Sequence, residues 1–151
     1  AFLDPDTETA AHERIERGLV EEARSRLIAE FIAVNDLVEF NLTGALNTNL
    51  AFLSGLAQAE LFDMSEDEIL NRVYENAEET RADTEDWLRA YLTMAYQPLS
   101  DEDLAAYIAF SARPEGQRLN RALFAGFGEM YDAQYLALGR AVARQLGAQD
   151  L

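Results

Sequence analysis

Apolar residues recur every three or four positions along most of the chain, which is the spacing of a buried stripe on an amphipathic helix. Such a stripe predicts a first helix over residues 7–40, although Gly18 disfavours one unbroken rod. We expect a break at Asn41–Gly44 and a further helical stripe over 46–61. Since no segment alternates with the period of two that marks a half-buried strand, the pattern predicts an all-α fold.

Two further helices begin at recognisable capping sequences. Ser65 is followed three residues later by Glu68, the spacing of a capping box in which each side chain bonds the backbone of the other residue. From there the apolar stripe predicts a helix over 66–96, which would be about 45 Å long at 1.5 Å per residue. Ser100 and Asp103 repeat the spacing and predict the start of a shorter helix.

The last third of the chain predicts one long final helix. The preceding short helix is expected to end near Ser111, and Pro114 suits a first helical turn because its missing N–H is not needed there. The apolar stripe then keeps helical spacing to about residue 146, where Gly147 is a natural stop. Glycines at 126, 128 and 139 offer kink sites, but we expect another helix to pack closely against the small residues within 122–128.

Together these stripes predict a single all-helical domain over residues 1–151, with a disordered or extended lead at 1–6. We expect about five to six helices, two of them long. A compact chain of this length has a radius of gyration of about 15 Å, and helices of about 45–50 Å exceed the diameter that this implies. The predicted architecture is therefore an elongated antiparallel helical bundle.

The charge of the chain excludes several classes of partner. Twelve basic and 28 acidic residues give a net charge of −16. This argues against nucleic acid, whose binding depends on neutralising phosphates, and against an anionic membrane surface. No apolar run approaches the roughly 20 residues of a transmembrane helix. With no cysteine and one histidine, we expect no disulfide, no metal site and no cofactor.

No catalytic residue stands out from the sequence. His12 is the only histidine, so the paired Glu-x-x-His motifs of a di-iron helical bundle are missing. Ser54 does not lie in the strand–turn–helix context of a nucleophile elbow. The acidic stretch, residues 60–86, is interpreted as a solvated helix face, and nothing selects a catalytic carboxylate pair from it. We therefore lean against an enzyme and assign no catalytic residue.

One segment, residues 87–136, carries an ordered set of motifs. An aromatic-rich helix leads to Leu-Ser-Asp-Glu-Asp-Leu at 99–104 and then to Ala-Phe-Ser-Ala-Arg-Pro-Glu-Gly-Gln at 109–117. The segment resembles the bacterial family known as domain of unknown function 2059, with Ser111 in place of the family's aromatic residue after Phe110. The resemblance implies an all-helical, soluble protein that Gram-negative bacteria export, and it supplies no established activity.

Five residues near the predicted turn before the final helix are candidates for a binding surface. Phe110, Arg113 and Gln117 could form a surface groove, although packing of the turn is the preferred explanation of the motif. Arg118 and Arg121 lie three residues apart near a helix start and could hold an anion. The alternative for these arginines is salt bridges to the acidic stretch, which would place the final helix near it.

Tyr131 and Tyr135 extend the candidate set along the final helix. They belong to an aromatic stripe that is core by default, and a buried tyrosine needs a partner for its hydroxyl group. Several tyrosines together could instead line a pocket between helices for an apolar or amphipathic ligand.

Three functional hypotheses follow, in order of preference. The first is a non-enzymatic interaction or scaffold module of the periplasm, with an unknown protein partner and with a homodimer left open. The second is a binder of a small apolar or amphipathic ligand in a cleft between helices, and the third is a hydrolase of unrecognised type. Because the chain begins at Ala1 and carries the resemblance above, we expect that a signal peptide has been removed.

Overall fold

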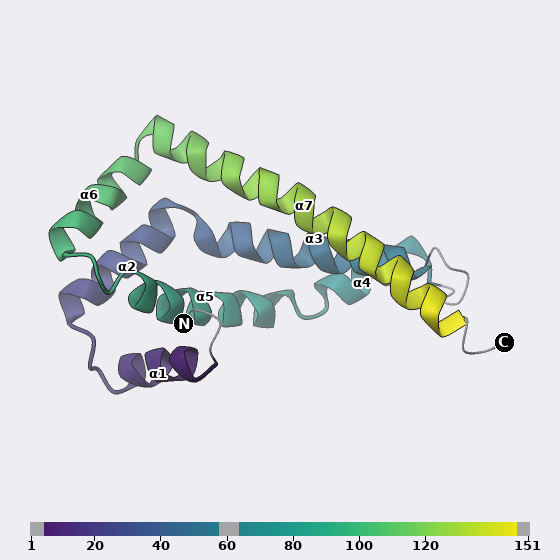
Figure 1. Ribbon diagram of the computed structural model, residues 1–151, viewed down its shortest axis with the longest axis horizontal. Helices are drawn as coiled ribbons and strands as arrows, with labels where there is room; N and C mark the ends of the chain where they lie inside the picture. Colours follow the sequence, from purple (N-terminus) through teal and green to yellow (C-terminus); the bar gives the residue numbers. More distant parts are fainter. Residues whose placement is uncertain (1–4, 58–63, 148–151) are drawn as a thin grey trace. The chain divides into compact units, whose positions relative to one another are not determined.

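The computed structural model describes residues 5–57 and 64–147 (Figure 1). Over these residues the chain is entirely helical and contains no strand, so the predicted all-α fold is confirmed. The described residues form seven helices rather than five to six. They are α1 (Pro5–Glu16), α2 (Glu22–Val34), α3 (Leu37–Ala57), α4 (Glu66–Tyr74), α5 (Ala77–Ala95), α6 (Asp101–Ser111) and α7 (Pro114–Gly147).

The first predicted helix is divided twice. Gly18 adopts a positive φ of 64° between α1 and α2, a conformation that glycine reaches without steric cost. Asp36 separates α2 from α3 with a φ of 52°, which aspartate tolerates better than most residues. The break expected at Asn41–Gly44 is wrong, because α3 runs through it with Leu42 buried. Packing of that side chain outweighs the weak helix propensity of its neighbours.

The capping box at α4 is confirmed, but the helix that follows is shorter than predicted. The Ser65 backbone N–H donates to the Glu68 carboxylate at 2.8 Å, and the Glu68 N–H donates to Ser65 Oγ at 3.3 Å. These hydrogen bonds hold the pKa of the Glu68 carboxyl below its ordinary value. The chain breaks after Tyr74 and restarts as α5, which places Glu78 and Glu79 in a new first turn. There the helix dipole stabilises their negative charge.

The chain divides into two compact units, each built from segments that are far apart in sequence. The first unit comprises Ala1–Glu39 and Arg81–Arg121, and the second comprises Phe40–Thr80 and Ala122–Leu151. Helices α3, α5 and α7 each contribute residues to both units. No helix of the described residues is long and apolar enough to cross a membrane.

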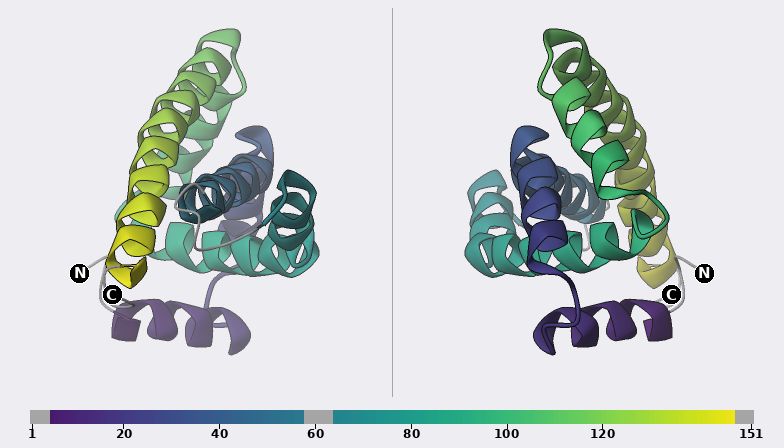
Figure 2. Two further views of the ribbon diagram at one scale, coloured as in Figure 1. Left: turned by 90° about the vertical axis from the view of Figure 1, so that its right-hand side faces the viewer. Right: turned by 90° about the vertical axis from the view of Figure 1, so that its left-hand side faces the viewer.

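The core of the first unit lies where α2 packs against α6, side by side in both Figures 1 and 2. Ile28 of α2 and Leu104 of α6 are fully buried there. The Phe31 ring contacts the rings of Tyr96 and Tyr107, each at a centroid distance of 5.1 Å. Burial and the neighbouring Tyr107 raise the pKa of the Tyr96 hydroxyl to about 12. The aromatic cluster therefore joins α2, the end of α5 and α6.

In the second unit, α3 and α7 meet at two glycines. A Cβ atom on Gly55 would lie 2.5 Å from the Leu136 carbonyl oxygen, and one on Gly139 would collide with the Phe52 carbonyl oxygen. Only glycine permits this backbone approach. The close approach predicted within 122–128 is wrong, since a Cβ on either glycine of that segment would meet no atom within 4 Å. It occurs three turns further along α7 instead.

Candidate functional site

The turn between α6 and α7 is held by two residues of the first turn of α7. Gly116 passes so close to the end of α6 that a Cβ would lie 2.8 Å from the Ser111 Cα atom. The Gln117 side-chain amide donates to the Val34 carbonyl at 2.7 Å and to the Ser111 carbonyl at 3.0 Å. Glycine at position 116 therefore allows the start of α7 to pass close to the end of α6. Gln117 satisfies backbone carbonyls at the ends of two helices.

An asparagine contact beside Gln117 was missed by the sequence analysis. The Asn120 amide donates to the Asn35 carbonyl at 2.8 Å, and the Asn35 side chain donates to the Phe31 carbonyl at 3.0 Å. Asn35 itself is 5% exposed. Asn35 and Asn120 lie 85 residues apart, and no local pattern predicts which distant carbonyl an amide will reach.

The other three candidates of this region stay at the surface. Phe110 is 39% exposed. Arg118 pairs with Glu115 of its own helix at 3.0 Å and not with the acidic stretch. Neither Arg113 nor Arg121 has an ion-pair partner among the described residues, and both are exposed. The structure therefore gives Gln117 a positioning role, while a groove for a ligand at this turn stays a prediction.

Tyr131 and Tyr135 lie in the second unit, separate from the five candidates of the first. They are 45% and 41% exposed, so their expected place in the core is wrong. The Tyr131 ring is roughly parallel to that of Phe127, at a centroid distance of 6.4 Å. A pocket around these tyrosines stays a prediction.

The two tyrosines belong to an exposed row of large apolar side chains on α7. Its members are each 40–54% exposed and recur at helical spacing within the second unit. We call this row the apolar stripe; it comprises Leu123, Phe127, Met130, Tyr131, Tyr135 and Leu138.

The inward face of the same half of α7 also carries apolar side chains: Phe124 stacks on Phe40 of α3 at a centroid distance of 4.7 Å, and Leu136 is half-buried. Gly139 and Ala143 are buried there, and Asp132 is half-buried. One carboxylate oxygen of Asp132 is buried without a hydrogen-bond partner among the described residues. Helix α7 therefore carries apolar side chains on its inward face as well as on the exposed stripe, which is wider than the single apolar face of an ordinary amphipathic helix.

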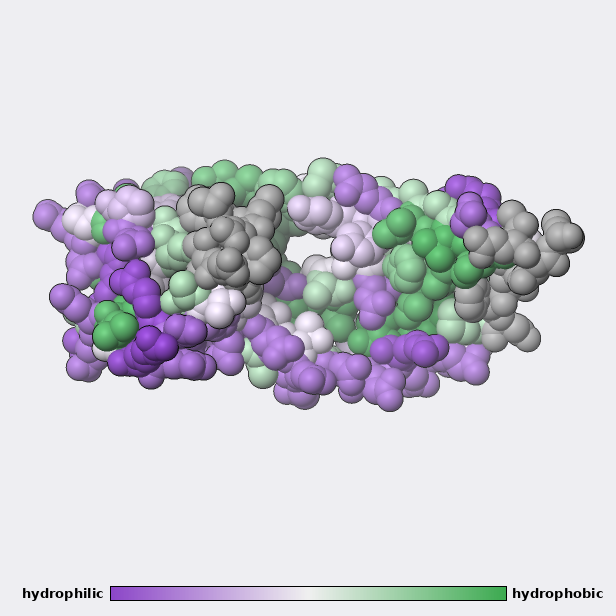
Figure 3. Space-filling model, turned by 60° about the horizontal axis from the view of Figure 1, so that its bottom comes forward, coloured by the Kyte–Doolittle hydropathy of each residue, from purple (hydrophilic) through white to green (hydrophobic). Residues whose placement is uncertain are grey.

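Hydrophobic surface is also visible elsewhere on the molecule. Figure 3 shows one face on which hydrophobic patches lie between strongly hydrophilic surface. Leu70 and Tyr74 of α4 are 42% and 60% exposed.

The acidic residues of the acidic stretch that the structure describes are mostly exposed, which confirms its interpretation as a solvated face. The described residues contain no cluster of three or more side chains that could hold a metal ion.

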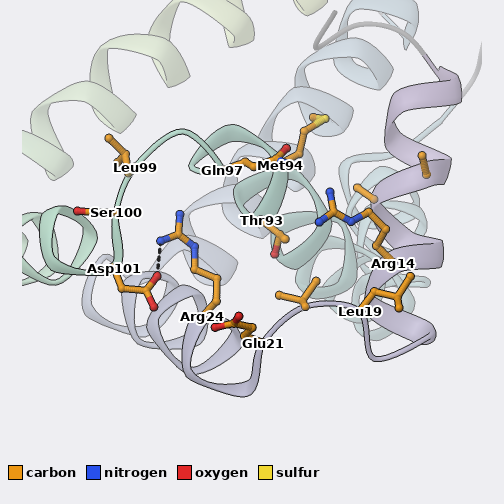
Figure 4. A pocket seen from close by; sticks show the side chains of 13 residues that line it. Arg14, Leu19, Glu21, Arg24, Thr93, Met94, Gln97, Leu99, Ser100 and Asp101 are labelled. Atoms are coloured by element: carbon orange, nitrogen blue, oxygen red, sulfur yellow. Dashed lines mark hydrogen bonds and ion pairs between the residues drawn. The ribbon is translucent and has the colours of Figure 1, made fainter.

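The first unit contains a cavity of about 550 Å³ (Figure 4). It lies between α1, the segment before α2, the last turn of α5 and the start of α6. Its volume is within the range of roughly 300–1,000 Å³ that is usual for small-molecule sites. The lining residues are Ala10, Ala11, Arg14, Leu19, Val20, Glu21, Arg24, Thr93, Met94, Gln97, Leu99, Ser100 and Asp101.

Two arginines of the cavity lining differ in their contacts. The Arg24 side chain is 13% exposed; it binds the Asp101 carboxylate at 2.7 Å and the Tyr96 carbonyl oxygen. The exposed Arg14 has no ion-pair partner among the described residues. In Figure 4 its guanidinium group extends from α1 toward Thr93 of α5. Arg24 therefore fastens α2 to the α5–α6 turn, whereas Arg14 is available to a ligand.

Comparisons of the sequence with known protein families, of the chain with curated proteins, and of the structure with solved structures all find no match. The resemblance of residues 87–136 to the domain of unknown function 2059 stays a prediction.

Proposed function

We propose that the protein is a non-enzymatic interaction module of the periplasm that binds an amphipathic helix of a partner protein. The binding face is the apolar stripe of α7, and its exposure is the observation that carries the proposal. The periplasmic location rests on the family resemblance of residues 87–136. An all-helical binding module needs no cofactor and no catalytic group, which agrees with the lack of catalytic motifs in the sequence.

The area of the apolar stripe is in the range of functional surface patches. Aromatic side chains offer about 150–250 Å² each, so six large side chains at 40–54% exposure leave roughly 500 Å² of surface. The largest apolar patch on a typical monomer is about 300–600 Å² and is often functional. A face of this size supports a transient partner at the low end of specific interfaces.

The arrangement of α7 lowers stability in a way that a binding role explains. The outward face keeps six large apolar side chains in water, while the inward face keeps an unsatisfied carboxylate oxygen of Asp132. Burying a polar atom without a partner costs free energy. Local violations of packing rules are typical of functional sites. Apolar side chains four residues apart lie on one face of a helix, and such side chains anchor one helix to another.

The charge of the chain favours a different protein over a second copy. Two copies would each carry −16 and repel. Helix α7 itself carries four arginines and three acidic residues, so the repulsion comes from the remaining helices. A partner helix with an apolar face and basic residues elsewhere is attracted by the whole chain and covers the stripe.

The elongated antiparallel arrangement of the helices is likewise our proposal. Its support is the length of α7, whose 34 residues span about 51 Å. Small-angle X-ray scattering would contradict it by giving the radius of gyration of a compact chain, about 15 Å.

The binding proposal is tested with an idealised amphipathic peptide of leucine and lysine, about 18 residues or five turns long. We expect saturable binding in the micromolar range by isothermal titration calorimetry. The double variant Phe127→Ser with Leu138→Ser is expected to weaken binding at least tenfold, because it removes two anchors of the stripe.

The matched control changes two exposed apolar residues of α4 in the same unit, Leu70→Ser with Tyr74→Ser. This control is expected to bind the peptide like the parent protein. Equal loss in both double variants would show general hydrophobic adsorption and contradict the proposal. Sedimentation velocity at high salt, where repulsion between two copies is screened, tests whether a second copy of the chain covers the stripe instead of a different protein. A dimer that Phe127→Ser converts to a monomer would assign the stripe to a second copy.

A further inference from the structure

The cavity of the first unit is separate from the apolar stripe and uses none of its residues. Its floor and rim are partly apolar: Ala11 is buried, whereas Leu19 and Leu99 are 62% and 37% exposed. Both leucines expose apolar surface to water beside the cavity, and an apolar group bound there would cover that surface.

The unpaired charge at this cavity is the second observation. Arg24 is already neutralised by Asp101 at 2.7 Å, so it contributes structure more than ligand charge. Arg14 has no ion-pair partner among the residues that the structure describes. Figure 4 shows its guanidinium group directed across the cavity. A guanidinium group offers paired N–H donors that match a carboxylate. An uncommitted arginine beside a hollow is notable because acidic residues outnumber basic ones 28 to 12.

We propose that this cavity binds a small amphipathic anion, an aliphatic carboxylate whose head group meets Arg14 while its tail lies against Leu19, Val20 and Met94. These side chains line one hollow but come from α1, the segment before α2, and α5. The ligand would therefore bridge α1 to the rest of the first unit. Glu21 also lines the cavity and repels the anion, which limits the affinity.

Dodecanoate, kept below its micellar concentration, is the probe, and isothermal titration calorimetry measures its binding to the full chain. We expect one saturable site. Arg14→Gln is expected to weaken binding about tenfold, since a charge-assisted hydrogen bond is lost. Glu21→Gln is expected to tighten it about two- to threefold because a like charge is removed. Arg14 makes no described ion pair, so its variant is expected to fold like the parent, which circular dichroism checks.

The matched control is Arg17→Gln, which removes the same charge from a neighbouring position outside the cavity. Arg17 pairs with Glu13 at 3.2 Å and has a 68% exposed side chain. It is expected to leave dodecanoate binding unchanged. Dodecanol, which has the same tail without the charge, is expected to bind more weakly and to be insensitive to Arg14→Gln.

Several results would overturn the assignment. One is the lack of saturable dodecanoate binding, and another is equal weakening by the Arg14 and Arg17 variants. Dodecylammonium binding as tightly as dodecanoate would assign the cavity to cations instead. If Phe127→Ser abolished dodecanoate binding while Arg14→Gln left it unchanged, the binding site would lie at the apolar stripe and not in the cavity. Because the stripe and the cavity share no residue, either proposal can fail alone.

Discussion

Glycines on α7 have two different roles, although the sequence shows them as equivalent small residues. Gly139 allows the α3 backbone to pass, whereas Gly128 faces open space and only weakens the helix. The sequence predicts that small residues serve close packing, but it does not predict which of them meets another helix. That depends on where two segments cross, and Gly55 and Gly139 lie far apart in the chain.

Alanine substitutions at these two glycines are expected to have opposite effects on the free energy of unfolding. Gly139→Ala should destabilise by about 1–3 kcal/mol, because its methyl group collides with the Phe52 carbonyl oxygen. Gly128→Ala should stabilise by up to about 1 kcal/mol, since alanine is the better helix former in open space. Urea unfolding measures both, and a neutral Gly139→Ala would contradict the crossing.

Tyr96 is expected to make stability depend on alkaline pH. Its pKa is raised from 10.0 to about 12 by burial and by Tyr107. Below pH 10 the hydroxyl keeps its proton in both states, so the contribution is fully present. As pH rises from 10 toward 12, the unfolded chain releases its proton first and stability falls. Thermal unfolding of Tyr96→Phe is expected to show a shallower decline over this window than the parent, and an equal decline would contradict the assignment.

At the scale of helices, the capping signals predicted where α4 and α6 begin, and the apolar stripe predicted the long helix α7. Ser65 and Ser100 both cap as expected, and α7 is helical from the predicted Pro114 to Gly147, the last residue that the structure describes. The breaks after α2 and α4 were missed because a turn of two residues barely disturbs an apolar periodicity. At the break after α2 the residue with a positive φ is Asp36, so no glycine marks this break in the sequence.

The junction of α2, α6 and α7 is expected to depend on Gln117. Gln117→Ala removes two hydrogen bonds to backbone carbonyls, of Val34 and Ser111. The loss is expected to lower the free energy of unfolding by about 1–3 kcal/mol. Gln134→Ala, an exposed glutamine on the same helix, is the control and should change stability by less than about 0.5 kcal/mol. Equal effects in the two variants would count against a positioning role.

At the scale of the whole chain, the apolar periodicity predicted the all-helical fold but wrongly placed Tyr131 and Tyr135 in the core. The helical spacing of Tyr131 and Tyr135 was correctly recognised, yet periodicity does not say which face of a helix points inward. In the structure the buried face of α7 contains Gly139, which meets the α3 backbone, while both tyrosines stay exposed. The cavity likewise depends on Arg14 and Met94, which lie 80 residues apart and carry no shared motif.

The most direct test of the account is the stability of the double variant Phe127→Ser with Leu138→Ser. If both side chains belong to an exposed binding face, urea unfolding should show a loss of less than about 2 kcal/mol. Truncating two core side chains of this size would cost more than about 5 kcal/mol. A loss of that size would show that the apolar stripe is part of the core and would contradict its assignment as the partner surface.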